Sequence, residues 1–229
     1  MARQYDLLIF DWDGTLADST GVIVDGMQRA IRALGLAARS DDAIRMLIGL
    51  GFREGLSELY PEHDPVELEA ALMAYRSAQG EHAAHSVAPL YEGVLDVLTA
   101  LQSDGHRLAV ATGKSRFGLD RAIAHHAPLE RAFIATRTAD ETATKPNPLM
   151  LYELLAECRV PAHRALMIGD TDYDIAMAEA AGVPSLAVAG GAHPMERLRS
   201  AGALAVLDAI THLPAWLQTA RFDNNGDSE

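Results

Sequence analysis

Apolar and polar positions divide the chain into two kinds of pattern: short apolar runs and longer stretches with helical spacing. Residues 5–10 form an apolar run rich in strand formers that stops at Asp11, which predicts a buried strand. From residue 19 to residue 34 the apolar side chains fall at helical spacing. Gly35 follows as a stop, so this stretch is predicted to be a helix.

Three further helical patterns follow along the chain. They cover residues 42–50, 52–59 and 66–84. Because no convincing strand pattern occurs between residues 17 and 88, we expect this stretch to be an all-helical insert.

After Pro89 the pattern changes to short apolar strands that alternate with helices. The predicted strands are residues 107–111, 132–135, 165–168 and 185–188, with residues 204–206 as an edge-strand candidate. The predicted helices are residues 94–103, 118–125, 149–158 and 173–181. This alternation predicts an α/β fold, a Rossmann-like doubly wound and mainly parallel sheet. We expect an α/β core of residues 1–16 and 89–222, a helical insert of residues 17–88, and a polar, disordered tail of residues 223–229.

Composition and charge narrow the class of protein. The chain has 229 residues, 49% hydrophobic and 22% charged, as in an ordinary globular protein. Its formal net charge of -13 argues against a nucleic acid or an anionic membrane as partner. The single cysteine, Cys158, excludes an internal disulfide and a multi-cysteine zinc site. Since no apolar run approaches the roughly 18 residues of a membrane span, we expect a cytoplasmic protein.

Acidic residues stand directly after two of the predicted strands. Asp11 and Asp13 follow the first strand, and Asp170 follows the strand at residues 165–168. Ligands of such sheets bind beyond the carboxyl ends of the strands, so these carboxylates are expected to meet. Converging carboxylates without a histidine or cysteine cluster suit a hard ion, so we predict a Mg2+ site at Asp11, Asp13 and Asp170.

The other strand ends supply groups that bind phosphate. Lys145, one of only two lysines, contributes a positive charge, and Thr112 contributes a hydroxyl donor. Gly14 and Gly113 lack side chains where backbone amides would approach an anion closely.

With these residues in place, the chain resembles the haloacid dehalogenase superfamily, in particular its phosphoglycolate-phosphatase-like branch with a helical cap. The segment Asp11-Trp12-Asp13-Gly14-Thr15 resembles the nucleophile loop, although that family usually has Phe or Leu in place of Trp. By resemblance, Thr112 fills the second motif, Lys145 the third, and Asp170 with Asp174 the fourth. The second motif reads Thr-Gly-Lys where many relatives have Thr-Asn-Lys, so any substrate contact made by that Asn is absent.

The resemblance implies a phosphatase mechanism. Asp11 would attack phosphorus and become phosphorylated, while Asp13 would act first as general acid and then as general base. The Asp11 and Asp170 side chains and the Asp13 backbone carbonyl would hold Mg2+. Asp174 would support the site, either by binding a metal-coordinated water or by orienting Lys145. These two roles stay open.

The resemblance also assigns a role to the helical insert. Residues 17–88 resemble the cap that closes over the site and selects the leaving group. Residues 49–54 resemble the part of the cap that faces the site, which makes Arg53 a candidate substrate contact. The expected substrate is a small phosphorylated metabolite, with phosphoglycolate the first to test, and the expected assembly is a monomer or homodimer.

Other functions remain open at this point. A sugar-phosphate mutase would return the phosphoryl group to substrate, and a non-catalytic binding protein would keep only the fold. Haloacid dehalogenation is disfavoured, because it needs neither Mg2+ nor an acid such as Asp13. Cys158 and Arg164 have the spacing of cysteine-dependent phosphatases, but Pro161 removes an amide donor between them and the loop has no glycine.

Overall fold

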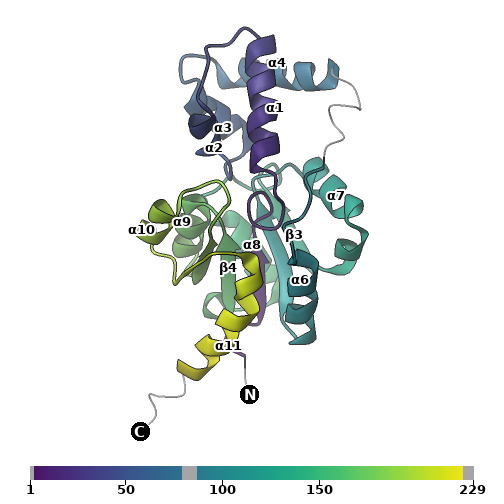
Figure 1. The fold of residues 1–229 in the computed structure, drawn as a ribbon, viewed down its shortest axis with the longest axis vertical. Coiled ribbons are helices and arrows are strands. Elements are labelled where there is room, and N and C mark those ends of the chain that lie inside the picture. Colours follow the sequence, from purple (N-terminus) through teal and green to yellow (C-terminus); the bar gives the residue numbers. More distant parts are fainter. Residues whose placement is uncertain (1–2, 79–86, 224–229) are drawn as a thin grey trace.

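A computed structural model describes residues 3–78 and 87–223 of the chain. Within these residues it shows a six-stranded sheet in the order β3-β2-β1-β4-β5-β6, in which each neighbouring pair is parallel (Figure 1). The strands are β1 Leu7–Phe10, β2 Arg107–Thr112, β3 Ala135–Thr138, β4 Ala165–Gly169, β5 Ser185–Val188 and β6 Val206–Leu207. The predicted doubly wound parallel sheet is confirmed. Its strand order reverses at β1, between β2 and β4, where ligands of such folds bind.

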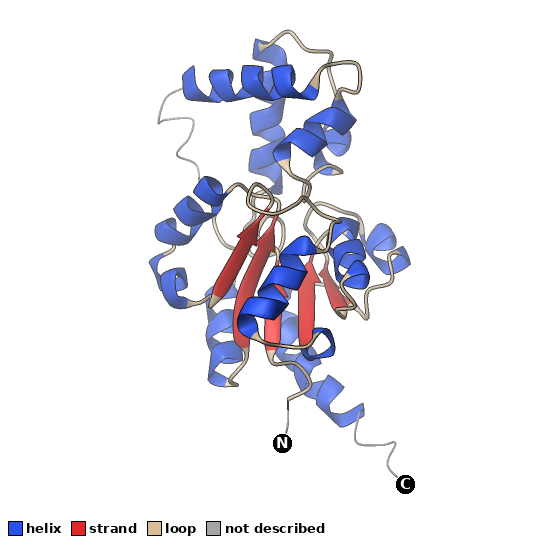
Figure 2. Ribbon diagram, turned by 180° about the vertical axis from the view of Figure 1, so that it is seen from behind, coloured by secondary structure: helices blue, strands red, loops and turns tan. Residues whose placement is uncertain are grey.

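The central strand explains why helices cover both faces of the sheet (Figure 2). Leu8 and Phe10 of β1 point to one hydrophobic cluster, and Leu7 and Ile9 point to another. Successive side chains of a strand leave on opposite faces of the sheet. Since both pairs are fully buried, both faces must be covered by helices. The first cluster includes residues of α6 Val94–Ser103, α7 Arg116–His125 and α11 Leu213–Asp223, and the second includes residues of α8 Leu149–Cys158 and α9 Asp172–Ala180.

The remaining elements of this layer are short. The helix α10 Met195–Ser200 packs Leu198 against Ile175 and Ala187. The 3-10 helices are η1 Ala127–Arg131, η2 Ala162–Arg164 and η3 Ile210–His212.

The predicted helical insert forms its own layer above the sheet. Its helices are α1 Thr20–Ala33, α2 Asp41–Arg45, α3 Phe52–Leu59 and α4 Pro65–Ala78. They share a separate hydrophobic cluster that contains Val24, Ile31, Ile44, Leu56 and Leu72. The strand arrows of Figure 2 point toward this layer, so the helices lie over the carboxyl ends of the strands. Of the predicted helix 66–84, residues 79–84 lie outside the described residues.

One predicted strand was wrong in its position. We placed a strand at residues 132–135, but β3 begins at Ala135 and runs to Thr138. The short helix η1 ends just before Ala132, and pairing with β2 starts only where Ala109 meets Ala135. Since β3 is an edge strand, its polar Thr136 and Arg137 are tolerated there, which hid the strand from an apolar pattern.

A predicted helix also ends earlier than expected. The pattern at residues 42–50 predicted one helix, but α2 ends at Arg45 and the chain then turns. Gly49 adopts a positive φ of 105°, which a helix does not allow, and the Met46 carbonyl accepts hydrogen bonds from outside the helix. The helical spacing was real, but contacts to the α/β core override it.

The end of the chain differs from the prediction as well. The edge strand expected at residues 204–206 is β6, Val206–Leu207. Asp223, which we assigned to a disordered tail, ends helix α11, and residues 224–229 lie outside the described residues.

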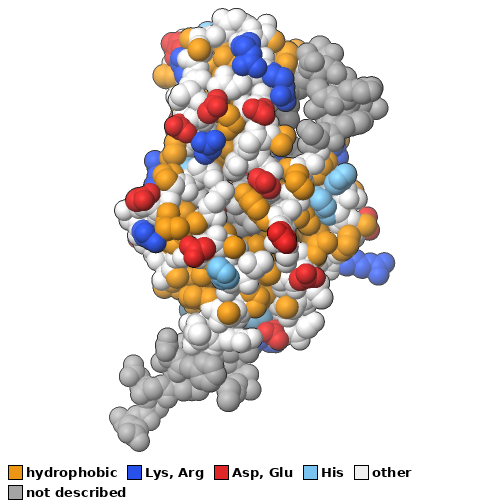
Figure 3. All heavy atoms as spheres, viewed as in Figure 1, with side chains coloured by type: hydrophobic (Ala, Val, Ile, Leu, Met, Phe, Trp, Pro, Cys, Tyr) orange, Lys and Arg blue, Asp and Glu red, His pale blue; other side chains and the backbone are white. Residues whose placement is uncertain are grey.

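The surface and the helix lengths add two observations. On the face drawn in Figure 3, acidic, basic and apolar side chains are interspersed over both layers. Among the described residues, no helix combines the length and the apolar character that crossing a membrane requires.

Candidate active site

The loops that follow β1 and β4 bring three carboxylates together. Asp11 follows β1 directly, Asp170 follows β4, and Asp174 lies in the first turn of α9. One carboxylate oxygen of each lies within 4.8 Å of the others, and all three side chains are buried. Because β1 and β4 are paired in parallel, their carboxyl ends place these residues at one edge of the sheet.

Lys145, from the loop after β3, enters this cluster as its positive charge. Its Nζ lies 2.8 Å from Asp11 Oδ1 and 2.6 Å from Asp174 Oδ1. The lysine side chain is completely buried, a state that such a side chain reaches only when it is paired. The predicted lysine and two of the acidic residues therefore form one buried ion cluster.

Asp170 is held in place by neighbouring polar groups. Thr15 Oγ1 donates to Asp170 Oδ1 over 2.7 Å, and the Ala192 amide donates to Oδ2 over 2.7 Å. A Cβ atom at Gly14 or Gly191 would overlap the Asp170 carboxylate. The two glycines thus leave the room that this carboxylate occupies.

Asp174 is part of the N-terminal cap of α9. Its Oδ2 accepts hydrogen bonds from the Thr171 amide (3.1 Å) and the Thr171 hydroxyl (2.7 Å). The Asp174 amide in turn donates to Thr171 Oγ1 (3.3 Å), which completes a capping box with the bond from the Thr171 amide. Its Oδ1 faces Lys145. This contact fits one of the two roles that the sequence left open, orientation of Lys145, and the position of Asp174 beside Asp11 and Asp170 fits the other.

The electrostatics of the cluster are unbalanced, because three carboxylates share one ammonium group. Burial, together with the nearby carboxylates, raises the pKa of Asp11 to about 7 even though Lys145 opposes the shift. Burial and the charges of Asp11 and Asp174 also raise the pKa of Asp170 well above its ordinary value. For Lys145, burial would lower the pKa, but Asp11 and Asp174 outweigh that effect and raise it.

This arrangement fits a divalent cation. Asp11 Oδ1 faces Lys145, whereas the buried Oδ2 accepts no hydrogen bond from the described part of the chain. A buried acceptor without a donor is costly, and a hard cation satisfies it with the oxygen ligands present here. Asp11 and Asp170, both predicted ligands, lie in this set. Asp174, predicted only as support, lies beside them.

The Asp13 carboxylate contacts a lysine other than Lys145. Its two oxygens are 2.7 Å and 2.9 Å from Nζ of Lys114, the only other lysine of the chain. Thr112, at the end of β2, is buried, and its Oγ1 accepts a hydrogen bond from the Lys114 amide at 3.3 Å. Lys114 is a residue to which the sequence analysis gave no role. Its signal was the rarity of lysine in this chain.

The remaining predicted site residues differ in their placement. The Gly14 amide donates to the Ala17 carbonyl, so it is already engaged in its own turn. Gly113 lies against the backbone of residues 49–50 of the helical layer. Arg53, on α3, forms an ion pair with Glu69 of α4 at 2.6 Å, within the helical layer.

The cysteine alternative loses its support in this structure. Cys158 is buried at the end of α8, and burial raises the pKa of its thiol, the opposite of what a nucleophile needs. Arg164 precedes β4 and pairs with Asp6 before β1, at the amino ends of the strands. Arg164 therefore lies at the opposite edge of the sheet from Asp11.

The sequence analysis missed several residues that shape the site. Gly191 and Ala192 follow β5 and approach Asp170, and Thr171 caps α9. The pair Gly190-Gly191, one residue after a predicted strand, was an available signal, because glycine marks close approach of a backbone to another group.

Comparison with known proteins shows which family the chain resembles. The sequence model of the family described as haloacid dehalogenase-like hydrolase matches residues 8–188. The chain is 34% identical to a probable phosphatase IndB of Dickeya dadantii, covering 90% of this chain and 91% of that protein. It is 32% identical to a phosphoglycolate phosphatase of Rhodospirillum rubrum, covering 92% and 90%. A crystal structure of a putative haloacid dehalogenase-like hydrolase from Bacteroides fragilis is similar, with a TM-score of 0.83, 27% identity, and coverage of 91% and 99%.

Proposed function

The chain belongs to the haloacid dehalogenase-like hydrolases and is a phosphatase of that family, and we propose that it hydrolyses a small phosphorylated metabolite through a covalent phosphate on Asp11. The observation that carries this proposal is the state of Asp11. It stands at the reversal point of the sheet with its carboxylate buried. Oδ1 is paired with Lys145, and Oδ2 accepts no hydrogen bond from the described part of the chain. The Oδ2 acceptor is therefore available to a cation or to phosphorus.

The proposed reaction has two steps. In the first, an Asp11 oxygen attacks phosphorus, the bond to the ester oxygen breaks, and protonated Asp13 delivers its proton to that oxygen. In the second, water attacks the phosphorylated Asp11, and Asp13 takes the proton from that water. The bond between phosphorus and Asp11 breaks, and inorganic phosphate leaves.

The other residues would position the phosphate and balance its charge. Thr112 would donate its hydroxyl to a phosphate oxygen, and Lys145 would compensate negative charge beside Asp11. Asp174 would keep Lys145 in place through the contact already described. Mg2+, held by Asp11 and Asp170 and by the Asp13 backbone carbonyl, would neutralise charge that otherwise repels a phosphate from this acidic site.

The finer parts of the function are proposals. We propose residues 17–88 as the cap, with Arg53 as a substrate contact, and phosphoglycolate as the first substrate to test, since a relative carries that name. The cytoplasmic location and the monomeric or homodimeric state stay predictions.

Phosphate release from an aryl phosphate tests the proposal directly. We expect release that depends on Mg2+, stops on chelation, and persists in Cys158→Ala. A chelator-resistant activity that is lost in Cys158→Ala would contradict the mechanism. A screen of phosphorylated metabolites, phosphoglycolate included, would then identify the substrate.

Product analysis separates the alternatives. A phosphatase releases inorganic phosphate in large excess over any isomer, whereas a sugar-phosphate mutase accumulates isomer. A non-catalytic binding protein would bind a phosphate ester without releasing phosphate, and that result would reject the proposal.

A further inference from the structure

Lys114 contacts the side chain of Asp13, one of the two carboxylates to which the proposed reaction gives a chemical step. One ammonium group donates to both Asp13 oxygens, because Lys114 Nζ lies 2.7 Å from Oδ1 and 2.9 Å from Oδ2. Among the described residues, Lys114 supplies the only hydrogen bonds that this carboxylate accepts. The direction of the Asp13 side chain therefore depends on Lys114.

The backbone of Lys114 is held on both sides. Its amide donates to Thr112 Oγ1 at 3.3 Å, and its carbonyl accepts from the Ala139 amide at 3.3 Å. Ser115 follows directly as the N-cap of α7, where its side chain accepts from the Gly118 amide. The lysine side chain thus starts from a fixed point and ends on two oxygens, which lets it hold its partner in place.

The turn that carries Asp13 fixes the backbone of this residue but not its side chain. The Trp12 carbonyl accepts from the Leu16 amide (3.0 Å) and the Ala17 amide (2.9 Å), and the Gly14 amide donates to the Ala17 carbonyl (2.9 Å). An aspartate on such a turn still has several staggered rotamers to choose from. The contact with Lys114 selects one of them.

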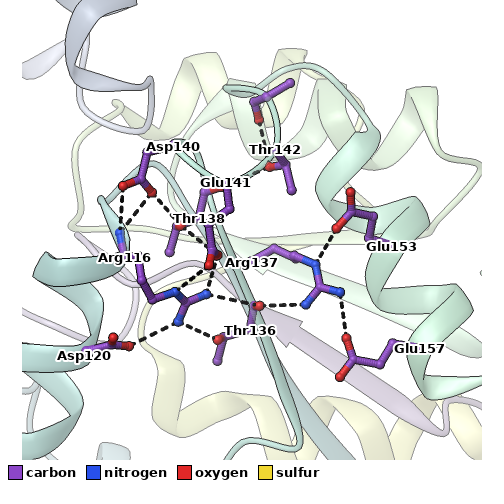
Figure 4. Close-up of polar contacts among 11 residues, drawn as sticks. Arg116, Asp120, Thr136, Arg137, Thr138, Asp140, Glu141, Thr142, Glu153 and Glu157 are labelled. Carbon is purple, nitrogen blue, oxygen red and sulfur yellow. Dashed lines mark hydrogen bonds and ion pairs between the residues drawn. The ribbon is translucent and has the colours of Figure 1, made fainter.

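A competing attraction lies close to Asp13. Asp11, two residues earlier, belongs to the buried cluster whose ammonium group is Lys145, and a cation bound there would attract any carboxylate within reach. Yet Asp13 is not one of the three carboxylates that gather in that cluster. Nor is the nearby Arg116 a partner for it, since that guanidinium is bound to Glu141 (Figure 4). Lys114 is therefore the group that keeps Asp13 apart from the cluster.

The pair also differs from the cluster in exposure. The side chains of Lys114 and Asp13 are 22% and 12% exposed, whereas those of Lys145 and Asp11 are 0% and 1% exposed. Solvent and a leaving group can therefore reach the Asp13 carboxylate, which a proton carrier requires.

We propose that Lys114 is a positioning residue, which holds the Asp13 carboxylate at the accessible side of the site and out of the cation-binding cluster. Asp13 remains the group that exchanges a proton with the ester oxygen and with water, and Lys114 acts only through it. This inference rests on the proposed function, because it needs the role that Asp13 has in that reaction.

The dependence of the rate on the leaving group tests this role. The oxygen of an alkyl phosphate with an uncharged alcohol needs a proton to leave, whereas a nitrophenyl phosphate leaves as a stable phenolate. In Lys114→Met we expect kcat/KM to fall by about tenfold to a hundredfold for the alkyl ester and by much less for the aryl ester, because a misplaced Asp13 fails where a proton must be delivered. A general structural defect would lower both values equally.

Three further variants separate the contact from the charge. Lys114→Arg keeps a cation that donates to both oxygens and should restore most of the loss. Arg199→Met removes an exposed positive charge of α10 and is the charge-matched control, so both esters should react at the wild-type rate. In an Asp13→Asn background, Lys114→Met should add no further loss for the alkyl ester, because the residue through which Lys114 acts is already changed.

Binding of Mg2+ without substrate gives an arm that does not depend on turnover. In Lys114→Met the Asp13 carboxylate loses its partner and can join the carboxylates of the cluster, so Mg2+ should bind tighter by about fivefold or more. The gain should be much smaller in the Asp13→Asn background and absent in Arg199→Met. Titration calorimetry of the purified protein measures these affinities.

Several results would overturn the inference. They are equal losses for both esters in Lys114→Met, a full further loss in the Asp13→Asn background, or an unchanged affinity for Mg2+. A higher KM for phosphoglycolate alone would also overturn it, because Lys114 would then bind the carboxylate of that substrate. Failure of the proposed function has a different signature: Asp11→Asn would release phosphate as fast as the wild type, while the Mg2+ affinities would still respond to Lys114.

Discussion

Two charged clusters of this protein differ in how their charges are satisfied. The first is the buried site cluster, in which Asp11 and Asp174 contact Lys145 and Asp170 lies beside them. The second, which we call the arginine network, joins β3, α7 and α8 (Figure 4). Its members are Arg116, Asp120, Arg137, Asp140, Glu141, Glu153 and Glu157.

In the arginine network each arginine is well matched with acceptors. Arg116 donates to Glu141 at 3.0 Å and 2.5 Å, and Arg137 donates to Glu153 at 2.5 Å and Glu157 at 2.6 Å. Hydrogen bonds from Arg116 lower the pKa of Glu141, whereas burial raises the pKa of Asp11. A satisfied network supports structure, while an unbalanced buried cluster keeps binding capacity for a cation and a phosphate. This comparison predicts opposite responses to removal of a charge.

The largest expected effect is on catalysis at Asp11. In Asp11→Asn, phosphate release should fall by roughly 10⁴-fold or more, because the nucleophile is lost. The same change should raise the melting temperature of the metal-free protein, since it removes one of three crowded carboxylates. Steady-state phosphate release and thermal unfolding in chelator measure the two effects. A lower melting temperature would contradict the view of the cluster as unbalanced.

Removal of the single positive charge should have the next largest effect. Lys145→Met leaves the buried carboxylates without compensation and should destabilise the metal-free fold at pH 8 by about 3–5 kcal/mol. Mg2+ should restore part of that loss, because it replaces the missing charge. Denaturant unfolding with and without Mg2+ measures both. Wild-type stability in chelator would show that Lys145 compensates no repulsion.

The response to pH follows from the sign of the Asp11 shift. The pKa of Asp11 is about 7 in the folded protein against an ordinary 3.8, so the folded state binds this proton more tightly than the unfolded state. The resulting penalty is absent below the lower value and grows until pH passes the higher one. Metal-free protein should therefore melt at higher temperature at pH 5.5 than at pH 8, and Asp11→Asn should reduce that difference. An unchanged difference in the variant would remove Asp11 as the cause.

The smallest effect is expected in the arginine network. Glu157→Gln weakens one half-exposed ion pair with Arg137 and should cost under about 1 kcal/mol, because exposed pairs are screened by solvent. Phosphate release should stay at the wild-type level. A loss of several kcal/mol would mean that the network is more than a surface support.

The comparison of pattern and structure shows what kind of feature a sequence predicts well. The strands with continuous apolar runs, β1 and β4, were predicted to within two residues and one residue at their ends, because burial on both faces demands apolar side chains. The edge strand β3 was misplaced, because half of its surface is free to be polar. Residues 46–50 follow a helical pattern yet turn, because Tyr173 and His193 capture the Met46 carbonyl.

For the site, the sequence predicted which side chains gather at the sheet edge, but it did not predict which of them contact one another. Strand ends pointed to Asp11, Thr112, Lys145 and Asp170 because parallel strands share a carboxyl edge. The pairing of Lys114 with Asp13 was not predictable, since nothing in the spacing links residues about 100 positions apart.

By itself, the sequence determined the sheet class, the helical insert and the side chains that gather at the sheet edge, because periodicity and strand ends are local properties. Only the tertiary structure decided which charged side chains contact one another. It also decided that Gly14 and Gly191 make room for Asp170, and that Gly113 makes room for the backbone of residues 49–50. Those facts depend on distances across the fold, which no local pattern encodes.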